Sequence, residues 1–225
     1  MIKCCIFDLD GTILNTLETI RYYLNRTMTK YGRAPISEEE CRLFVGAGAR
    51  VLLTKAFNSR GGIDEKEFEV ALSEYMADYD RDPYHLTEKY KGIDELIDEL
   101  KKRKIKLAVL SNKPDFATRS AAKHFFGNSF TVVHGGRDGI PLKPSPEGCL
   151  EILSELSALP SECVYIGDSD VDVMTGKNMN AALTVSVCWG FRTKEELNLS
   201  GAEHIVSSVD EICTLIDNFN KGEKK

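Results

Sequence analysis

Short runs of apolar residues recur along the chain, and helical patterns separate them. The runs cover residues 2–7, 105–110, 130–133, 163–166 and 183–188. They do not alternate cleanly between apolar and polar residues, which is typical of strands buried on both faces of a parallel sheet. Residues 93–100 and 150–156, which lie between these runs, repeat apolar positions at helical spacing. This alternation predicts an α/β fold with a Rossmann-like parallel sheet.

Residues 16–84 break this rhythm, because they contain no comparable apolar run. Helices are expected there after Ser37, Gly48 and Asp64. The expected domains are therefore an α/β core built from residues 1–15 and 85–225, and an all-helical domain at 16–84 inserted into it. The first helix of the inserted domain is indicated by five residues that share one helical face: Leu17, Ile20, Leu24, Met28 and Tyr31.

The composition excludes several classes of protein. Of the 225 residues, 42% are hydrophobic and 28% are charged, which rules out a disordered, collagen-like or coiled-coil chain. The net charge is −6, so the chain as a whole is not attracted to nucleic acid or to anionic membranes. We expect neither as a partner, and an anionic ligand must be held by a few placed groups or by a metal.

The sequence also bears on the expected compartment. No stretch approaches the about 18 uninterrupted apolar residues of a membrane span, and Asp8 and Asp10 interrupt the N-terminal apolar run. The cysteines show no C-x-x-C spacing, which is typical of small buried hydrophobic residues in a reducing compartment. We therefore expect a cytoplasmic protein. The seven cysteines are Cys4, Cys5, Cys41, Cys149, Cys163, Cys188 and Cys213.

Two acidic motifs follow predicted strands. Strand alternation places Asp8 and Asp10 on one side of the end of the first strand, where open α/β sheets bind ligands. Neighbouring carboxylates oppose each other's ionisation, so a metal or a shared proton is expected. Asp168, Asp170 and Asp172 follow another buried strand, and oxygen-only ligands favour Mg²⁺. The alternatives are an ordinary Asp-Gly turn at the first motif and a first helical turn with acidic residues at the second.

Two further motifs could hold an anion. Ser111 and Asn112 close the second strand at a strand-to-helix turn, where free backbone N–H groups can cradle an anion. Capping of the next helix is the alternative interpretation. Lys143 precedes Pro144, and a helix is expected to begin with Ser145 as its N-cap and Pro146 in its first position. Lys143 is thereby held as a fixed positive charge, although most single loop lysines are merely solvated.

Taken together, the four motifs resemble those of the haloacid dehalogenase superfamily of phosphatases. They are DLDGT (8–12), LSNK (110–113), KPSPEG (143–148) and GDSDVD (167–172), in that order. The helical insert resembles the cap of these enzymes, so the resemblance covers nearly the whole chain. Within the superfamily, residues 44–53 and 189–192 are most similar to phosphoglycolate phosphatases. The resemblance implies a sheet in the order 5-4-1-2-3, with the first and fourth motifs on adjacent strands.

The resemblance also implies a role for each motif residue. Asp8 would attack phosphorus and form an aspartyl-phosphate, and Asp10 would act as general acid and then general base. The expected ligands of Mg²⁺ are the Asp8 carboxylate, the Asp10 backbone carbonyl and Asp168. Substrate binding would fall to Ser111, Asn112 and Lys143, with Thr12 and Asp172 in support. The expected partner is a small phosphate ester, with 2-phosphoglycolate as the leading substrate.

Other functions remain open at this stage. Asp10 favours phosphate esters over haloacids, and Gly167 stands where β-phosphoglucomutases usually carry Glu, which favours a hydrolase over a mutase. A pyrophosphatase or nucleotidase, a phosphosugar mutase and a non-catalytic phosphate-binding regulatory protein are the alternatives. The leaving group and the oligomeric state are undetermined.

Residues outside the four motifs give weaker indications of function. Arg21, Arg50 and Lys55 are interpreted as exposed helix charges, with contact to a substrate carboxylate or second phosphate as the alternative, above all for Arg50. The four histidines show no metal-binding spacing. Trp189 is interpreted as a packing residue.

Overall fold

The structure is a computed structural model that describes residues 1–222. The chain divides into two compact units, one formed by Met1–Leu14 with Lys89–Lys225 and the other by Asn15–Glu88. The last three residues of the expected core range 85–225 lie outside the described part. Two short strands that pair with each other, β2 (Leu14–Asn15) and β3 (Glu88–Lys89), mark the two places where the chain passes between units.

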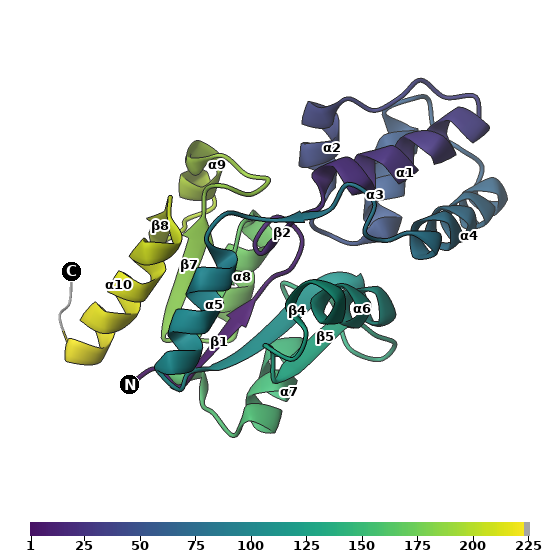
Figure 1. The fold of residues 1–225 in the computed structure, drawn as a ribbon. Helices are drawn as coiled ribbons and strands as arrows, with labels where there is room; N and C mark the ends of the chain where they lie inside the picture. Colours follow the sequence, from purple (N-terminus) through teal and green to yellow (C-terminus); the bar gives the residue numbers. More distant parts are fainter. Residues whose placement is uncertain (223–225) are drawn as a thin grey trace. The chain divides into compact units, whose positions relative to one another are not determined.

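The larger unit contains a six-stranded sheet in the order β5-β4-β1-β6-β7-β8, and all five neighbouring pairs are parallel (Figure 1). The five predicted strands, numbered 1 to 5 along the chain, are β1, β4, β5, β6 and β7. Read from β7 to β5 they lie in the order 5-4-1-2-3, so the expected order is confirmed. A sixth strand, β8, extends the sheet beside β7. The strands are β1 (Cys4–Phe7), β4 (Lys106–Pro114), β5 (Val132–Gly136), β6 (Cys163–Gly167), β7 (Leu183–Val187) and β8 (His204–Val206).

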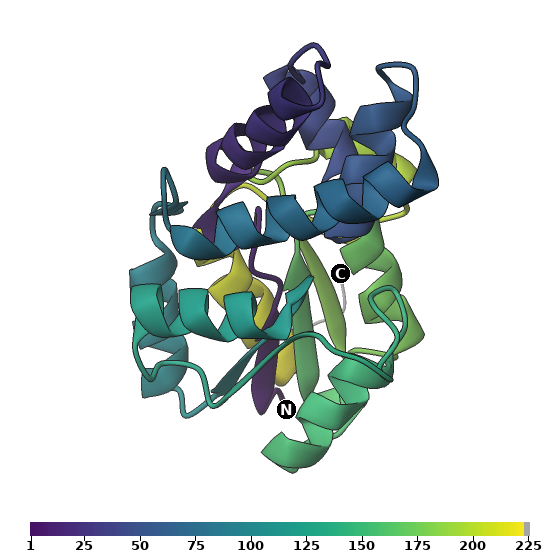
Figure 2. The ribbon, with the colours of Figure 1, turned by 90° about the vertical axis from the view of Figure 1, so that its right-hand side faces the viewer.

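Helices cover both faces of this sheet (Figures 1 and 2). Helix α7 packs against β4 and β5 and shares one core cluster with buried residues of β1, β4 and β6. Helices α5 and α10 contact each other on the opposite face, as Figure 1 shows. Because strands β1 and β6 are buried along their whole length, their continuous apolar sequence is explained. The helices are α5 (Ile93–Lys102), α6 (Asp115–Phe126), α7 (Glu147–Leu156), α8 (Asp170–Asn178), α9 (Lys194–Leu199) and α10 (Val209–Lys221).

The sequence placed the start of α7 one residue too early and assigned one exposed residue to its buried face. The helix begins at Glu147, and Pro146, not Ser145, is the residue before it. The Ser145 N–H instead donates to the Leu142 carbonyl in a turn. Leu150, expected on the buried face, is 44% exposed. The buried face has the 3-4 spacing of a helix packed on a sheet, in which Leu150 has no place. Its large residues are Cys149, Ile152, Leu153 and Leu156.

The smaller unit is all-helical in its described structure apart from the strand residues at its ends. Its helices α2, α3 and α4 begin directly after Ser37, Gly48 and Asp64, as predicted. Ser37 forms a capping box with Glu40, and the Asp64 carboxylate accepts from the Lys66 N–H, so side-chain caps fix two of these starts. The helices are α1 (Leu17–Lys30), α2 (Glu38–Phe44), α3 (Ala49–Asn58) and α4 (Glu65–Arg81).

All seven cysteines are free thiols, as expected. Five of them are buried, whereas Cys188 and Cys213 are half-buried. No helix within residues 1–222 combines the length and the apolar character needed to cross a membrane.

Candidate active site

Three carboxylates converge at the C-terminal edge of the sheet. Asp8 follows β1 and Asp168 follows β6, and the two strands pair in parallel with Phe7 opposite Ile166. The expectation that the first and fourth motifs lie on adjacent strands is thus confirmed. Asp172 joins them from the first turn of α8, and one oxygen from each carboxylate lies within 4.8 Å of the others. All three residues are buried.

Glycines make this close approach possible. Gly11 has a φ of +88°, and a Cβ there would lie 2.4 Å from Asp168 Oδ2. A Cβ on Gly167 would lie 2.3 Å from both Cβ and Cγ of Asp172. Such distances are far below van der Waals contact, so neither position accepts a side chain without moving a carboxylate. A Glu at position 167, the residue usual in β-phosphoglucomutases, is therefore incompatible with Asp172 as it is placed here.

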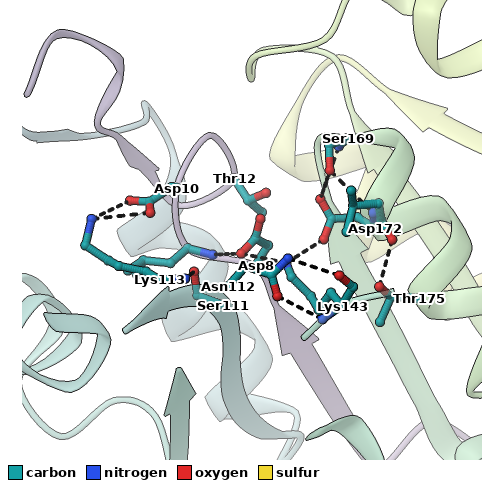
Figure 3. A network of polar contacts seen from close by, with 12 residues as sticks. Asp8, Asp10, Thr12, Ser111, Asn112, Lys113, Lys143, Ser169, Asp172 and Thr175 are labelled. Carbon is teal, nitrogen blue, oxygen red and sulfur yellow. Dashed lines mark hydrogen bonds and ion pairs between the residues drawn. The ribbon is translucent and has the colours of Figure 1, made fainter. Parts of the chain in front are cut away.

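A buried ammonium group bridges two of the carboxylates (Figure 3). Lys143 Nζ lies 2.9 Å from Asp8 Oδ1 and 2.7 Å from Asp172 Oδ1. Burial lowers the pKa of Lys143, but the attraction of Asp172 and Asp8 outweighs it, so the pKa lies above its usual value. The Asn112 side chain fixes the backbone of this lysine, because it accepts from the Lys143 N–H at 2.8 Å and donates to the Lys143 carbonyl at 3.1 Å.

Asp172 forms an ion pair with Lys143 and is itself held by further hydrogen bonds. Its Oδ1 accepts from Tyr165 at 2.9 Å as well as from Lys143, and its Oδ2 accepts from the Ser169 hydroxyl at 2.6 Å. Burial opposes ionisation of Asp172, but Lys143 and these hydrogen bonds prevail and lower its pKa. Asp170, by contrast, is exposed and lies 3.5 Å from Arg192. The interpretation of Asp170 as an ordinary acidic residue of a first helical turn fits this position.

The segment after β7 holds Asp168. The Phe191 N–H donates to Asp168 Oδ2 at 2.7 Å, and the Thr12 hydroxyl donates to Oδ1 at 3.0 Å. Trp189 donates its indole N–H to the Thr12 carbonyl at 3.0 Å, which ties this segment to the turn after β1. The pKa of Asp168 is raised to about 7, chiefly by burial and secondly by repulsion from Asp172. Sequence analysis found Thr12 but interpreted Trp189 only as packing and missed Phe191.

Asp10 lies apart from these carboxylates. Its two oxygens lie 3.4 and 3.3 Å from Lys113 Nζ, and both side chains are mostly buried. Figure 3 shows this pair on one side of Asp8, with Lys143 and Asp172 on the other. Lys113 was missed as a site residue, although it is the last residue of the LSNK motif. Ser111 is buried beside it and its hydroxyl accepts from the Lys113 N–H at 3.2 Å.

The cationic candidates of the helical unit each have a partner within that unit. Arg50 makes two hydrogen bonds to Glu69, at 2.6 and 2.8 Å, on the exposed surface. Arg21 bonds Glu18 one turn away, and Lys55 donates to the Leu43 carbonyl. These contacts fit the interpretation of Arg50 and Lys55 as exposed helix charges, whereas the expectation was wrong for Arg21, which is half-buried.

A second group of possible metal ligands lies away from the site. It consists of His134 on β5 with Glu151 and Glu155 on α7. Arg137 contributes a cation there, because it bonds Glu151 at 2.7 Å and His134 Nδ1 at 2.9 Å. The group is satisfied as an ion-pair network, which sequence spacing did not reveal.

The sequence profile of the haloacid dehalogenase-like hydrolase family matches residues 5–185. The chain belongs to this family. Phosphoglycolate phosphatase 1 of Pseudomonas aeruginosa is 32% identical over 202 residues, covering 86% of this chain and 74% of that protein. The phosphoglycolate phosphatase of Vibrio parahaemolyticus is 27% identical over 221 residues and covers 96% of each. The chain is thus an enzyme of the phosphatase type within the haloacid dehalogenase-like hydrolases.

Solved structures support this assignment. A protein of Lactobacillus delbrueckii subsp. bulgaricus, provisionally named a phosphoglycolate phosphatase, has a TM-score of 0.89 and 30% identity, covering 93% of this chain and 96% of that chain. The β-phosphoglucomutase of Clostridium difficile has a TM-score of 0.77 at 21% identity, covering 99% of each chain, and shows the shared fold alone.

The carboxylate group suits the divalent cation that haloacid dehalogenase-like hydrolases generally use. Burial raises the pKa of Asp8 well above its usual value, and Asp172 and Asp168 raise it further against the attraction of Lys143. Such a group favours a cation that removes this repulsion. Its donors are oxygens only, which is the preference of hard divalent cations such as Mg²⁺. Asp172 is engaged by Lys143, so Asp8 and Asp168 are the carboxylates that fit a metal best.

Proposed function

We propose that this chain is a Mg²⁺-dependent phosphomonoester hydrolase that acts through an aspartyl-phosphate on a small organic phosphate. The observation that carries this proposal is the placement of Asp8, which lies 2.9 Å from the Lys143 ammonium and forms with Asp168 part of a buried carboxylate group that could hold a cation. An anionic nucleophile needs such neutralising groups before it can approach a phosphate dianion.

The first step forms a bond between Asp8 and phosphorus. Asp8 Oδ1 already accepts the Leu9 N–H at 2.7 Å and contacts Lys143, which leaves Oδ2 as the attacking oxygen. As that bond forms, the bond from phosphorus to the leaving oxygen breaks, and Asp10 donates a proton to the leaving oxygen. Lys143 and Ser111 hold the phosphoryl group during the transfer.

The second step releases phosphate. Asp10, now ionised, takes a proton from water, and the water oxygen bonds to phosphorus while the bond to Asp8 breaks. Asp8 returns to its original state, so the cycle closes with one phosphomonoester and one water consumed.

The metal ligands in this proposal are the Asp8 and Asp168 carboxylates and the Asp10 backbone carbonyl. The cation would stabilise the negative charge that develops on the phosphoryl oxygens. Thr12 and Phe191 orient Asp168 for this role, because each donates a hydrogen bond to a different oxygen of that carboxylate.

The leading substrate is 2-phosphoglycolate. Relatives named phosphoglycolate phosphatase match this chain at up to 32% identity, and one of them matches along 96% of it. We further propose that residues 16–84 act as a cap domain that excludes water and sets specificity. The geometry around Gly167 disfavours the mutase alternative.

The test is phosphate release from 2-phosphoglycolate, pyrophosphate, nucleoside monophosphates and sugar phosphates, with Mg²⁺ or with chelator. Asp8→Asn is the inactivating variant. Asp170→Asn is the matched control, because it makes the same change at an exposed acidic residue nearby. Release that requires metal and Asp8, with 2-phosphoglycolate giving the highest kcat/KM, supports the proposal. A different best substrate would replace 2-phosphoglycolate, and release that survives both chelator and Asp8→Asn would refute the mechanism.

A further inference from the structure

The Lys113–Asp10 pair differs from the other ion pairs of the site. Lys143 lies between two buried carboxylates, and its side chain is 2% exposed. The Lys113 and Asp10 side chains are 9% and 17% exposed, and they lie on the other side of Asp8 (Figure 3). The Lys113 ammonium is therefore a second cation of the site, after Lys143. It lies beside Asp10, the residue that contacts the leaving oxygen in the proposed mechanism.

The backbone of Lys113 is held in place. Its N–H donates to the Ser111 hydroxyl at 3.2 Å, and its carbonyl accepts from the Thr118 hydroxyl at 3.1 Å. A Cβ on Gly135 would lie 2.5 Å from the same carbonyl, so the neighbouring strand packs directly against this backbone. The position of the ammonium group can therefore vary only through rotation of the lysine side chain.

The charge balance of the site gives this ammonium a function. With every carboxylate ionised and both lysines protonated, the six site side chains carry two net negative charges, which one divalent cation neutralises. When Asp10 carries the proton that it donates as general acid, these side chains and the cation together have one positive charge left over, and a carboxylate on the leaving group neutralises it. The six side chains are Asp8, Asp10, Lys113, Lys143, Asp168 and Asp172.

We propose that Lys113 binds a carboxylate on the leaving group and so makes the site selective for phosphorylated 2-hydroxy acids. This inference rests on the proposed function and deepens it. In 2-phosphoglycolate the carboxylate is separated from the leaving oxygen by a single methylene. When Asp10 contacts the leaving oxygen, the ammonium group that now lies 3.3 Å from Asp10 is within reach of that carboxylate. Lys113 then exchanges the Asp10 carboxylate for that of the substrate, and Asp10, no longer held ionised by the ammonium, takes up from water the proton that it donates to the leaving oxygen.

A positioning role is the competing explanation, in which Lys113 only orients Asp10. The two explanations differ in substrate dependence. A positioning residue affects proton transfer to every leaving group, whereas a carboxylate-binding residue matters for substrates that carry one. The discriminating pair is 2-phosphoglycolate and 2-hydroxyethyl phosphate, which has a hydroxymethyl group in place of the carboxylate.

The experiment measures kcat and KM for both substrates with wild-type enzyme, Lys113→Met and Lys113→Arg. We expect Lys113→Met to lower kcat/KM for 2-phosphoglycolate by about 10- to 100-fold, chiefly through KM, because a hydrogen bond between charged groups is lost. The loss for 2-hydroxyethyl phosphate, which reports only the effect of Lys113 on Asp10, should be at least about tenfold smaller, and circular dichroism shows that the variant is folded. Lys113→Arg should retain the preference for 2-phosphoglycolate. Lys123→Met, at an exposed lysine of α6, is the control and should leave both substrates unaffected.

Equal losses on both substrates, or no loss on either, would overturn the inference while leaving the proposed function in place. Absence of turnover of any phosphomonoester by the wild-type enzyme would overturn both. Inhibition by the product provides a second measurement. Glycolate should inhibit the wild type at least about tenfold more strongly than Lys113→Met, and equal inhibition would contradict carboxylate binding.

Discussion

Lys143 Nζ lies 2.7 Å from Asp172 Oδ1, and both side chains are only 2% exposed. Asp172 also accepts from Tyr165 and Ser169, so it is firmly held and fixes the ammonium against Asp8. Through this pair, the first turn of α8 positions the ammonium group beside Asp8, the proposed nucleophile. A buried charge pair of this kind costs little while complete but much when one partner is removed.

Removing the ammonium group should therefore reduce both stability and activity. Lys143→Met leaves Asp172 without its cation, and we expect the free energy of unfolding to fall by about 3–5 kcal/mol. We expect kcat to fall by about 100- to 1,000-fold, because a group that stabilises transition-state charge is lost. Denaturant unfolding and steady-state kinetics measure the two effects.

The double variant Lys143→Met with Asp172→Asn separates these effects. It removes the uncompensated charge, so part of the stability should return while kcat stays low. A double variant as unstable as the sum of the two single variants would show that the residues are not coupled.

Gly11→Ala should affect the metal site beyond its effect on the backbone. The new methyl group would lie 2.4 Å from Asp168 Oδ2, and the φ of +88° disfavours a side chain as well. Gly61→Ala is the matched control, because Gly61 has a φ of +93° and no atom within 4 Å of the added Cβ. Backbone strain alone should cost each variant about 1–2 kcal/mol of stability.

Only Gly11→Ala should weaken Mg²⁺ binding, by at least about tenfold, since it displaces a proposed ligand. Calorimetric titration with Mg²⁺ measures the affinity. Similar affinities in the two variants would mean that the carboxylate of Asp168 tolerates displacement or does not bind the metal.

The sheet was predictable because its central strands are buried on both faces and must be continuously apolar. β8 escaped prediction because it has only three residues, two of them half-buried, which is too short to form a pattern. The buried face of α7 was misjudged because Leu150 fits a three-residue spacing, whereas packing follows Cys149 and Ile152.

The acidic residues of the site were predictable because their side chains carry the chemistry, and parallel strands bring strand ends together. Phe191 could not be found in this way, because it acts through a backbone N–H that almost any residue supplies. Trp189 likewise acts by bonding a carbonyl that is 177 positions away in sequence. Lys113 and Asp10 each lie within a recognised motif, but their pairing across 103 positions of sequence could not be predicted.

The Glu40–Arg60 pair of the helical unit allows a test of pH dependence. Glu40 accepts two hydrogen bonds from Arg60, at 2.8 and 2.7 Å, and one from the Ser37 N–H at 2.8 Å. The Arg60 bonds, followed by the Ser37 bond, lower the pKa of Glu40 from 4.5 to about 2. Because the folded-state pKa is depressed, the contribution to stability is present above about pH 4.5 and is lost as the pH falls toward about 2.

Arg60→Gln should raise the pKa of Glu40 toward its usual value, which NMR titration of the side-chain carboxyl carbon measures. Arg50→Gln, which removes the partner of Glu69 in the same unit, should leave the Glu40 pKa unchanged. If Glu40 in the wild type titrates near pH 4.5, the pair does not exist in solution as described.

Trp189 should report metal binding directly, because it is the one tryptophan of the chain and its indole N–H bonds the Thr12 carbonyl. The hydroxyl of the same Thr12 donates to Asp168, so a cation on Asp168 changes the polar surroundings of the indole. We expect Mg²⁺ to change the tryptophan emission with the affinity found by calorimetry. Asp168→Asn should abolish the change, and Asp170→Asn should preserve it.

Trp189→Phe should weaken Mg²⁺ binding by about tenfold, because the hydrogen bond from Trp189 to the Thr12 carbonyl is lost. Emission that stays constant while calorimetry shows saturation would mean that the bond between Trp189 and Thr12 does not couple to the metal site.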